Sequence, residues 1–207
     1  MKAHTKTTQD SLSPQDALTF LKEGNKRFIS NLSTNRNLLQ MVNETRDGQW
    51  PFAVVLSCID SRTSAELIFD QGLGDIFSAR VAGNVVNEDI LGSMEYAVKY
   101  AGSKLVLVLG HTKCGAVTSA CKKVKDGNIT ALLHKIKPAI DRATKESNGA
   151  TEDSVFIEKV ATFNVLEAME EVRERSPIIS NLEKEGKIMV VGAVYNVETG
   201  QVQFFEN

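Results

Sequence analysis

Two cysteines and one histidine stand where they could bind a metal ion together. Cys58 comes shortly after the apolar run 52–56, and His111 and Cys114 come after the apolar run 105–109. Uninterrupted apolar runs of this length are typical of strands that are buried on both faces of a parallel sheet. Two thiolates and one imidazole suit tetrahedral zinc and leave its fourth position open for water or substrate. A closed structural site would need a fourth Cys or His, and the sequence offers no convincing one.

A carboxylate and a guanidinium follow the first cysteine of this set, as Asp60 and Arg62. The aspartate could simply cap the next turn, and the arginine could be an ordinary surface charge. Beside a metal ion, two such groups so close in sequence favour a functional ion pair. The remaining candidates are better explained without chemistry: Cys121 as a packing residue on the core side of a helix, and His4 and His134 as solvated surface residues.

The composition indicates one globular domain in a reducing compartment. A chain of 207 residues can bury a sizeable core, and 42% hydrophobic residues is ordinary for a soluble domain. The formal net charge of −2 argues against a nucleic-acid-binding surface, and no apolar run reaches the length of a membrane span. The polar start of the chain lacks the apolar core of a signal peptide. Three cysteines are too few for a disulfide framework, so we expect a cytoplasmic protein whose thiols bind metal.

The N-terminal quarter divides into three segments. Residues 1–12 are polar and are expected to form a disordered tail. Ser13 and Pro14 are typical of a helix start, which predicts a helix over 14–29. Residues 30–50 then form an arm that is expected to be irregular although it carries several apolar side chains. Helix and arm together make the segment 13–50, which needs a partner surface to cover its apolar residues.

From residue 51 to residue 207 the chain alternates between strands and helices and is expected to form one α/β domain. The sequence predicts strands over 52–57, 76–81, 105–109, 187–194 and 202–205. It predicts helices over 64–69, 88–100, 114–125, 129–146 and 152–174, with a break at 147–149 and with Pro177 beyond the end of the last one.

This alternation predicts a doubly wound, mostly parallel sheet of about five strands that ends in an antiparallel hairpin. If the strand order is 2-1-3-4-5, the ends of the first and third strands meet at the switch point, where ligands bind in such sheets. Cys58, His111 and Cys114 would then converge. Cys114 would also open a helix, whose N-terminus favours a thiolate.

The two motifs, Cys-x-Asp-x-Arg and His-x-x-Cys in this order, resemble those of the β-class carbonic anhydrases, and the resemblance runs from about Ser13 to the C-terminus. It implies one zinc ion per chain, bound by Cys58, His111 and Cys114. It also implies reversible hydration of carbon dioxide to bicarbonate and a proton. The family's aspartate and arginine fall on Asp60 and Arg62, which are expected to act as a catalytic pair.

The residues around the open zinc position resemble the plant-like subclass of that family. Its pocket glutamine, phenylalanine and tyrosine fall on Gln49, Phe77 and Tyr96, and the residue after the second-motif cysteine, Gly115, also matches. The other subclass carries a tryptophan three residues before the first cysteine, where this chain has Val55. The segment 80–84 resembles the glycine–asparagine turn beside the pocket, and Ala116 stands where many members have a second glycine.

The resemblance further implies an obligate homodimer, or a tetramer built from two dimers, in which arm and edge strand wrap the neighbouring subunit. Near neutral pH we expect Asp60 to pair with Arg62 and to leave the fourth zinc position open. Two alternatives remain at this point. The same site could hydrolyse carbonyl sulfide or carbon disulfide, or the chain could be a zinc-stabilised binding module without turnover.

Overall fold

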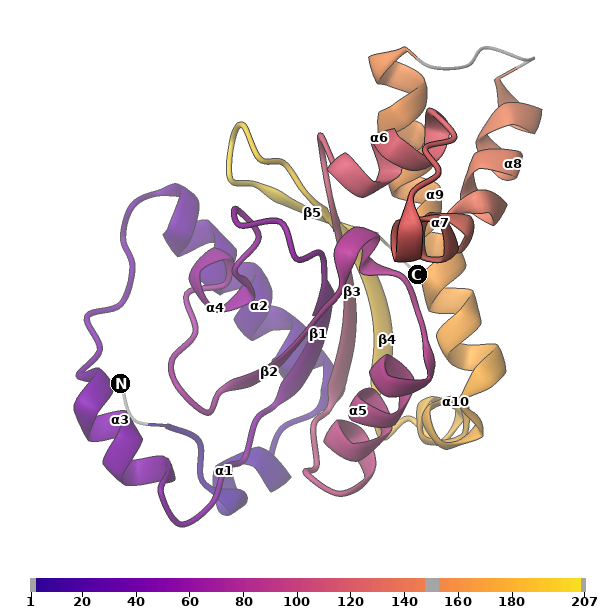
Figure 1. The fold of residues 1–207 in the computed structure, drawn as a ribbon. Helices are drawn as coiled ribbons and strands as arrows, with labels where there is room; N and C mark the ends of the chain where they lie inside the picture. Colours follow the sequence, from indigo (N-terminus) through magenta and orange to yellow (C-terminus); the bar gives the residue numbers. More distant parts are fainter. Residues whose placement is uncertain (1–2, 148–152, 206–207) are drawn as a thin grey trace.

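The computed structural model describes residues 3–147 and 153–205, and these form a five-stranded sheet flanked by helices (Figure 1). The strand order is β2-β1-β3-β4-β5, with the first four parallel and β5 antiparallel to β4, which confirms the predicted order. The strands are β1 (Ala53–Ser57), β2 (Ile76–Arg80), β3 (Leu105–His111), β4 (Met189–Tyr195) and β5 (Val202–Phe204).

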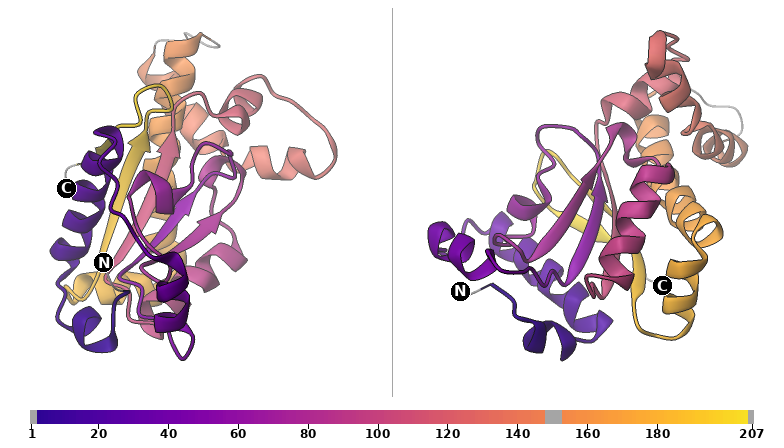
Figure 2. Two further views of the ribbon diagram at one scale, coloured as in Figure 1. Left: turned by 90° about the vertical axis from the view of Figure 1, so that its left-hand side faces the viewer. Right: turned by 60° about the horizontal axis from the view of Figure 1, so that its bottom comes forward.

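The inner strands β1 and β3 are mostly apolar because helices cover both faces of the sheet. Every residue of β1 and β3 is buried. Alternate side chains point to opposite faces, so Val55 packs in a cluster with Leu21 of α2, whereas Val54 packs in a second cluster with Met94 of α5 and Val165 of α9. Figure 2 shows the N-terminal helices on one side of the sheet and the long C-terminal helix on the other.

The helices fall into three groups. On one side of the sheet lie α1 (Lys6–Asp10), α2 (Pro14–Ile29), α3 (Leu38–Thr45) and α4 (Ala65–Ile68). On the other lie α5 (Glu88–Lys99), α9 (Ser154–Arg175) and α10 (Pro177–Lys184). At the end of the sheet where β3 finishes, α6 (Gly115–Cys121), α7 (Gly127–His134) and α8 (Lys137–Glu146) form the third group. Within the described ranges, no helix is both long and apolar enough to cross a membrane.

The expected disordered tail is wrong for residues 3–12, and residues 1–2 lie outside the described part. Lys6–Asp10 form α1, and Gln9 on this helix is buried. The Gln9 amide donates hydrogen bonds of 2.7 Å to the carbonyl oxygens of Pro51 and Ala101. A single buried polar side chain leaves no apolar periodicity, and for this reason the segment looked unstructured in the sequence.

The two surface histidines have different outcomes. His134 is exposed, as predicted. His4 is partly buried instead, because its ring lies 5.4 Å from the ring of Phe52 and 5.8 Å from that of Phe20.

The arm over residues 30–50 is more ordered than predicted, since it contains α3. Met41 on this helix is buried, and its side chain occupies the space that a Cβ at Gly72 would need. Four other large apolar side chains of the arm remain exposed in the single chain: Leu32, Leu38, Leu39 and Val42. The arm therefore still presents an apolar surface without cover.

The C-terminal helices differ from prediction where a proline starts a helix. Pro138 lies in the first turn of α8, which splits the predicted helix 129–146 into α7 and α8. Pro177 opens α10, capped by Ser176, where the sequence indicated only a helix end. In addition, α6 ends at Cys121, short of the predicted 125. The predicted break at 147–149 lies mostly outside the described residues, as does the first residue of the predicted helix 152–174, seen as α9.

Candidate metal centre and active site

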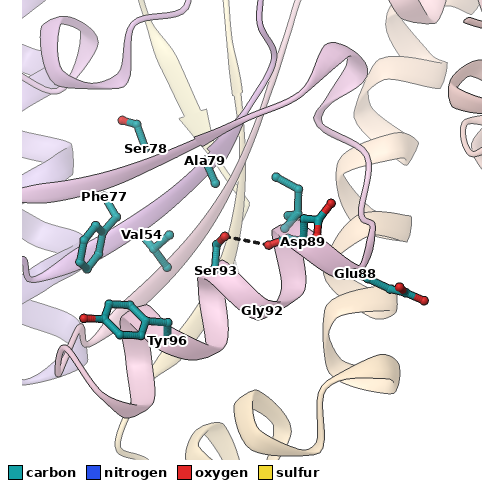
Figure 3. Close-up of a pocket in the computed structure, with 10 residues that line it drawn as sticks. Val54, Phe77, Ser78, Ala79, Glu88, Asp89, Gly92, Ser93 and Tyr96 are labelled. Atoms are coloured by element: carbon teal, nitrogen blue, oxygen red, sulfur yellow. Dashed lines mark hydrogen bonds between the residues drawn. The ribbon is translucent and has the colours of Figure 1, made fainter. Parts of the chain in front are cut away.

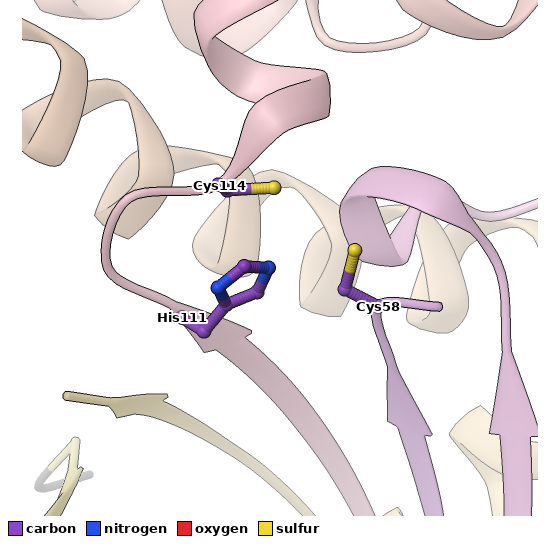
Figure 4. Close-up of side chains that lie close together, drawn as sticks. All are labelled: Cys58, His111 and Cys114. Atoms are coloured by element: carbon purple, nitrogen blue, oxygen red, sulfur yellow. The ribbon is translucent and has the colours of Figure 1, made fainter. Parts of the chain in front are cut away.

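Three predicted metal ligands meet at the carboxyl end of the sheet (Figure 4). Cys58 follows β1, His111 is the last residue of β3, and Cys114 caps the N-terminus of α6. Their two sulfur atoms and one ring nitrogen all lie within 4.8 Å of one another, and all three residues are at least 96% buried, with exposures of 4%, 1% and 1%. Three soft or borderline donors this close together form a site that could hold a metal ion.

The hydrogen bonding of His111 fits a metal ligand. Its Nδ1 lies 2.9 Å from the carbonyl oxygen of Thr112, and because a carbonyl only accepts, Nδ1 carries the proton. Its Nε2 is then a lone-pair donor, and this atom is buried without a hydrogen-bond partner. A buried nitrogen left unpaired costs free energy, and a cation between it and the two sulfur atoms would remove that cost.

The two thiols cannot both ionise easily without a cation. A hydrogen bond from the Cys114 thiol lowers the pKa of Cys58, against the opposing effect of burial. The pKa of Cys114 is raised, first by its bond to Cys58 and then by burial. The expected lowering of the Cys114 pKa by the helix N-terminus is therefore outweighed by the neighbouring thiolate. A divalent cation between them would favour two thiolates.

Two groups of the segment 80–84, the predicted turn beside the pocket, hold the Cys58 loop. Arg80 donates from Nε to the carbonyl oxygen of Cys58 at 3.0 Å and from Nη2 to that of Asp60 at 2.7 Å. The backbone N–H of Gly83 donates to the sulfur of Cys58 at 3.3 Å. Both contacts join segments that are distant in sequence, so no local pattern announces them.

Asp60 and Arg62 form an ion pair beside the three ligands. Two side-chain hydrogen bonds of 2.9 and 2.8 Å join them, and the Arg62 backbone N–H donates a third at 3.0 Å. The bonds from Arg62 hold the pKa of Asp60 well below its usual range, so the carboxylate is ionised. Its Oδ2 lies 3.9 Å from Nε2 of His111. Among the described residues, the group able to hold a metal comprises the two cysteines and the histidine without Asp60.

The residues assigned to a substrate pocket are only partly brought together. Phe77 on β2 and Tyr96 on α5 line a pocket of about 600 Å³ at the edge of the sheet, with ring centroids 6.5 Å apart (Figure 3). Neither Gln49 nor any of the three metal ligands lines this pocket. Gln49 is exposed at the end of the arm, and Gly115 is the first residue of α6, next to Cys114. Within one chain, Phe77 and Tyr96 thus form a site separate from the metal ligands.

A doubly wound sheet with a two-cysteine, one-histidine group at its carboxyl end defines an α/β protein with a site that could hold a metal ion. The chain matches the family model described as carbonic anhydrase over residues 53–202, and it belongs to that family. Its fold is that of the β class, and the chain is accordingly a carbonic anhydrase, an enzyme of the reversible hydration of carbon dioxide.

The similar proteins cover nearly the whole chain. "Carbonic anhydrase 2" of Mycobacterium tuberculosis is 35% identical over 196 residues, which is 91% of each protein. The carbonic anhydrase of Mycolicibacterium smegmatis is 32% identical over 197 residues, 92% of each. Among solved structures, the Coccomyxa β-carbonic anhydrase in complex with acetazolamide is 26% identical with a TM-score of 0.72, covering 91% of this chain and 86% of that one. The β-carbonic anhydrase CcaA is 25% identical with a TM-score of 0.74, covering 91% and 95%.

Proposed function

We propose that the chain hydrates carbon dioxide reversibly with one zinc ion held by Cys58, His111 and Cys114. The observation that carries the proposal is the buried, unpartnered Nε2 of His111, which lies within 4.8 Å of two sulfur atoms. Two sulfur atoms and an imidazole nitrogen suit zinc better than the harder magnesium or calcium ions. Zinc held there would make a nucleophile available from water near neutral pH, an effect for which carbonic anhydrase is itself the usual example.

Asp60 accepts the proton and orients the attacking oxygen. Its carboxylate is ionised because Arg62 lowers its pKa, and its Oδ2 lies 3.9 Å from Nε2 of His111. From there Oδ2 can accept a hydrogen bond from the attacking oxygen and orient the remaining lone pair toward the carbon atom. Arg62 keeps the carboxylate away from the metal, which leaves the fourth position open to water or substrate.

Gln49, Phe77 and Tyr96 bind the substrate, and Gly115 leaves room beside Cys114. An amide that donates to an oxygen and two aromatic rings that exclude water suit a small linear molecule such as carbon dioxide. A Cβ at Gly115 would meet nothing within 4 Å, so open space borders this position. These residues and Val55 support an active site of the plant-like subclass.

The active site is completed by a second copy of the chain, in a homodimer or a tetramer of two dimers. Phe77 and Tyr96 lie away from the metal ligands of their own chain, on an edge strand and on an exposed helix face where Tyr96 stacks against Tyr100. The arm adds four exposed apolar side chains, among them Leu39. Surfaces of this kind mark protein–protein contacts. A likeness in fold to the "tetrameric beta-carbonic anhydrases" of Sordaria macrospora agrees with such an assembly.

The three cysteines are buried and form no disulfide bond, which supports the further proposal that the protein works in the reducing cytoplasm.

The test combines elemental analysis for zinc with stopped-flow measurement of carbon dioxide hydration on the same preparation. One zinc per chain together with hydration is the expected result. If the protein binds zinc but turns over carbonyl sulfide or carbon disulfide and not carbon dioxide, one of these sulfur compounds is the substrate. Zinc without turnover of any of these gases would reduce the chain to a zinc-stabilised binding module.

A further inference from the structure

We propose that Asn164 is a positioning residue for the metal centre and acts on Cys58 through Gly83. The proposal rests on the proposed zinc site, since it concerns how one ligand of that site is held. Asn164 lies on α9, on the opposite side of the sheet from the N-terminal helices. Among the described residues, its side chain donates a hydrogen bond to Gly83 and not to any of the three candidate ligands.

Asn164 is a polar side chain in an apolar surface. It is 4% exposed, and the buried residues around it on α9 are Val160, Ala161, Val165 and Ala168. Burying an amide costs free energy unless it is hydrogen-bonded. Its Nδ2 donates to the carbonyl oxygen of Gly83 at 2.8 Å. Packing alone would be served by leucine, so the hydrogen bond is the specific contribution of the amide.

The turn that receives this hydrogen bond has an uncommon backbone conformation. Gly83 has φ +70° and Asn84 has φ +43°, two consecutive residues in the left-handed region. A Cβ at Gly83 would lie 3.0 Å from Cδ1 of Ile136 and 3.3 Å from Cβ of Ala116. Such a turn persists only where its surroundings fix it. Asn164 supplies a directional contact that fixes the carbonyl of Gly83.

The same glycine contacts the metal centre through its other backbone group. The N–H of Gly83 donates to the sulfur of Cys58 at 3.3 Å. A hydrogen bond to a thiolate stabilises its charge and orients its remaining lone pairs. If the hydrogen bond from Asn164 is lost, the carbonyl of Gly83 is unsatisfied and the turn can rotate. The sulfur of Cys58 then loses its aligned donor.

The test compares Asn164→Leu with Asn25→Leu. Asn25 is a matched control because it is also 4% exposed and also bonds only backbone groups, namely the carbonyl oxygens of Ile68 and Gly200 and the N–H of Val202. It lies on α2, on the other face of the sheet. Both substitutions remove a buried amide, so both are expected to lower the midpoint of thermal unfolding.

The discriminating measurement is zinc affinity of the folded variants, from competition with a chromophoric chelator. Asn164→Leu is expected to weaken zinc binding at least about 10-fold, in the range for loss of an outer-sphere partner. It should also shift the sulfur-to-metal absorption band of the cobalt-substituted protein, whereas Asn25→Leu should leave affinity and band unchanged. Equal affinities in wild type and Asn164→Leu, or equal losses in both variants, would overturn the proposal. A wild type that binds no zinc would instead refute the proposed function on which it rests.

A second measurement needs no variant and tests the hydrogen bond between Gly83 and Cys58, on which the proposal depends, if Asn164→Leu does not fold. In wild-type protein loaded with cadmium-113, the amide proton of Gly83 should show a scalar coupling to the metal through the sulfur of Cys58. Such a coupling requires the N–H to sulfur hydrogen bond. Its absence, with cadmium bound, would also overturn the proposal.

Discussion

The carboxylate of Asp60 meets the guanidinium of Arg62 edge to edge, with Nε 2.9 Å from Oδ1 and Nη2 2.8 Å from Oδ2. The backbone N–H of Arg62 donates to Oδ1 as well. Each carboxylate oxygen has two lone pairs, so Oδ1 is fully used and Oδ2 keeps one free. The free lone pair belongs to the oxygen that lies 3.9 Å from Nε2 of His111. Asp60 can thus accept a proton on the side of the metal ligands while it stays bound to Arg62.

Replacement of this arginine should abolish activity without loss of the metal. In Arg62→Ala the carboxylate of Asp60 loses both side-chain hydrogen bonds and becomes free to bind the zinc ion directly, which closes the site. We expect carbon dioxide hydration to fall at least about 100-fold, the scale of a lost general base, with one zinc per chain retained. Stopped-flow kinetics and zinc analysis on the same sample measure the two quantities.

Arg175→Ala is the control for the loss of a surface arginine, because Arg175 pairs with Glu171 along the exposed side of α9. This variant should keep wild-type activity. An active Arg62→Ala enzyme would show that Asp60 does not depend on the ion pair, and an inactive one without zinc would move the role of Arg62 to metal retention.

The three free cysteines should separate into two functional classes. Cys58→Ser replaces a soft thiolate by a weak hydroxyl donor and should lose zinc and activity together. Cys121→Ser is the matched control, since Cys121 is equally buried but lies outside the group of three possible ligands. It should keep one zinc per chain and lower only thermal stability. Zinc retained in Cys58→Ser at wild-type affinity would contradict the proposed ligand set.

Asp70 should stabilise the packing of the arm on the core, and this stabilisation should depend on pH. Its side chain is buried and accepts hydrogen bonds from the guanidinium groups of Arg27 and Arg36 and from Thr34. Burial raises the pKa of Asp70, but these hydrogen bonds outweigh it and bring the pKa to about 2, from 3.8. In Asp70→Asn two cations lose their counter-charge, and we expect the free energy of unfolding at pH 7 to fall by about 3 kcal/mol.

The sign of the pH dependence follows from the lowered pKa. The stabilisation by Asp70 is fully present above pH 3.8 and is lost as the pH falls toward 2. Denaturant unfolding of wild type and Asp70→Asn at several pH values measures it. The difference between the two proteins should be constant near neutrality and should shrink below pH 3.8; the loss of zinc in acid affects both and cancels. Asp47→Asn, in an exposed pair with Arg46, should show no difference at any pH. A difference between wild type and Asp70→Asn that did not shrink in acid would assign the effect to packing.

The convergence of the three candidate ligands could be predicted from the sequence because Cys58 follows the first apolar strand, and His111 and Cys114 lie at and just beyond the end of another. Strand ends at the switch point of a doubly wound sheet are adjacent by topology, so local patterns at Cys58 and His111 were enough to place them together. The start of the predicted helix 88–100 is a second example, because Asn87 directly before it caps α5 by accepting from the backbone N–H of Ile90. Features that depend on a few neighbouring residues could therefore be predicted from the sequence.

Features that depend on contacts between distant segments could not be predicted from the sequence. The hydrogen bonds of Arg80 to the Cys58 loop and of Asn164 to Gly83 join residues whose local sequence is that of an edge strand and of a helix. Pro177 shows a different limit of sequence-based prediction, because proline is common both after the end of a helix and in its first turn. Here the side chain of Ser176 caps the helix, and Pro177 is the first residue of α10.

The position of Tyr96 leads to a test of which subunit it serves. It lines the edge pocket with Phe77 and not the metal centre of its own chain, and it is 56% exposed. If it serves the partner's zinc site, both Cys58→Ser and Tyr96→Ala homodimers should have low activity. In a mixed dimer, however, the intact ligands of the Tyr96→Ala chain would receive Tyr96 from the Cys58→Ser chain. One complete site would form.

Random reassociation of equal amounts of the two variants makes about half of the dimers mixed, with one complete site in each. The mixture should therefore recover about a quarter of wild-type activity, well above the mean of the two separate variants. If Tyr96 served its own chain, no mixed dimer would contain a complete site, and activity would stay at that mean. Light scattering of each sample confirms that dimers or tetramers have formed again, and mixing Tyr96→Ala with Phe77→Ala provides the control. Both of those substitutions lie in one pocket, so every mixed dimer lacks one of the two rings at each site and no recovery is expected.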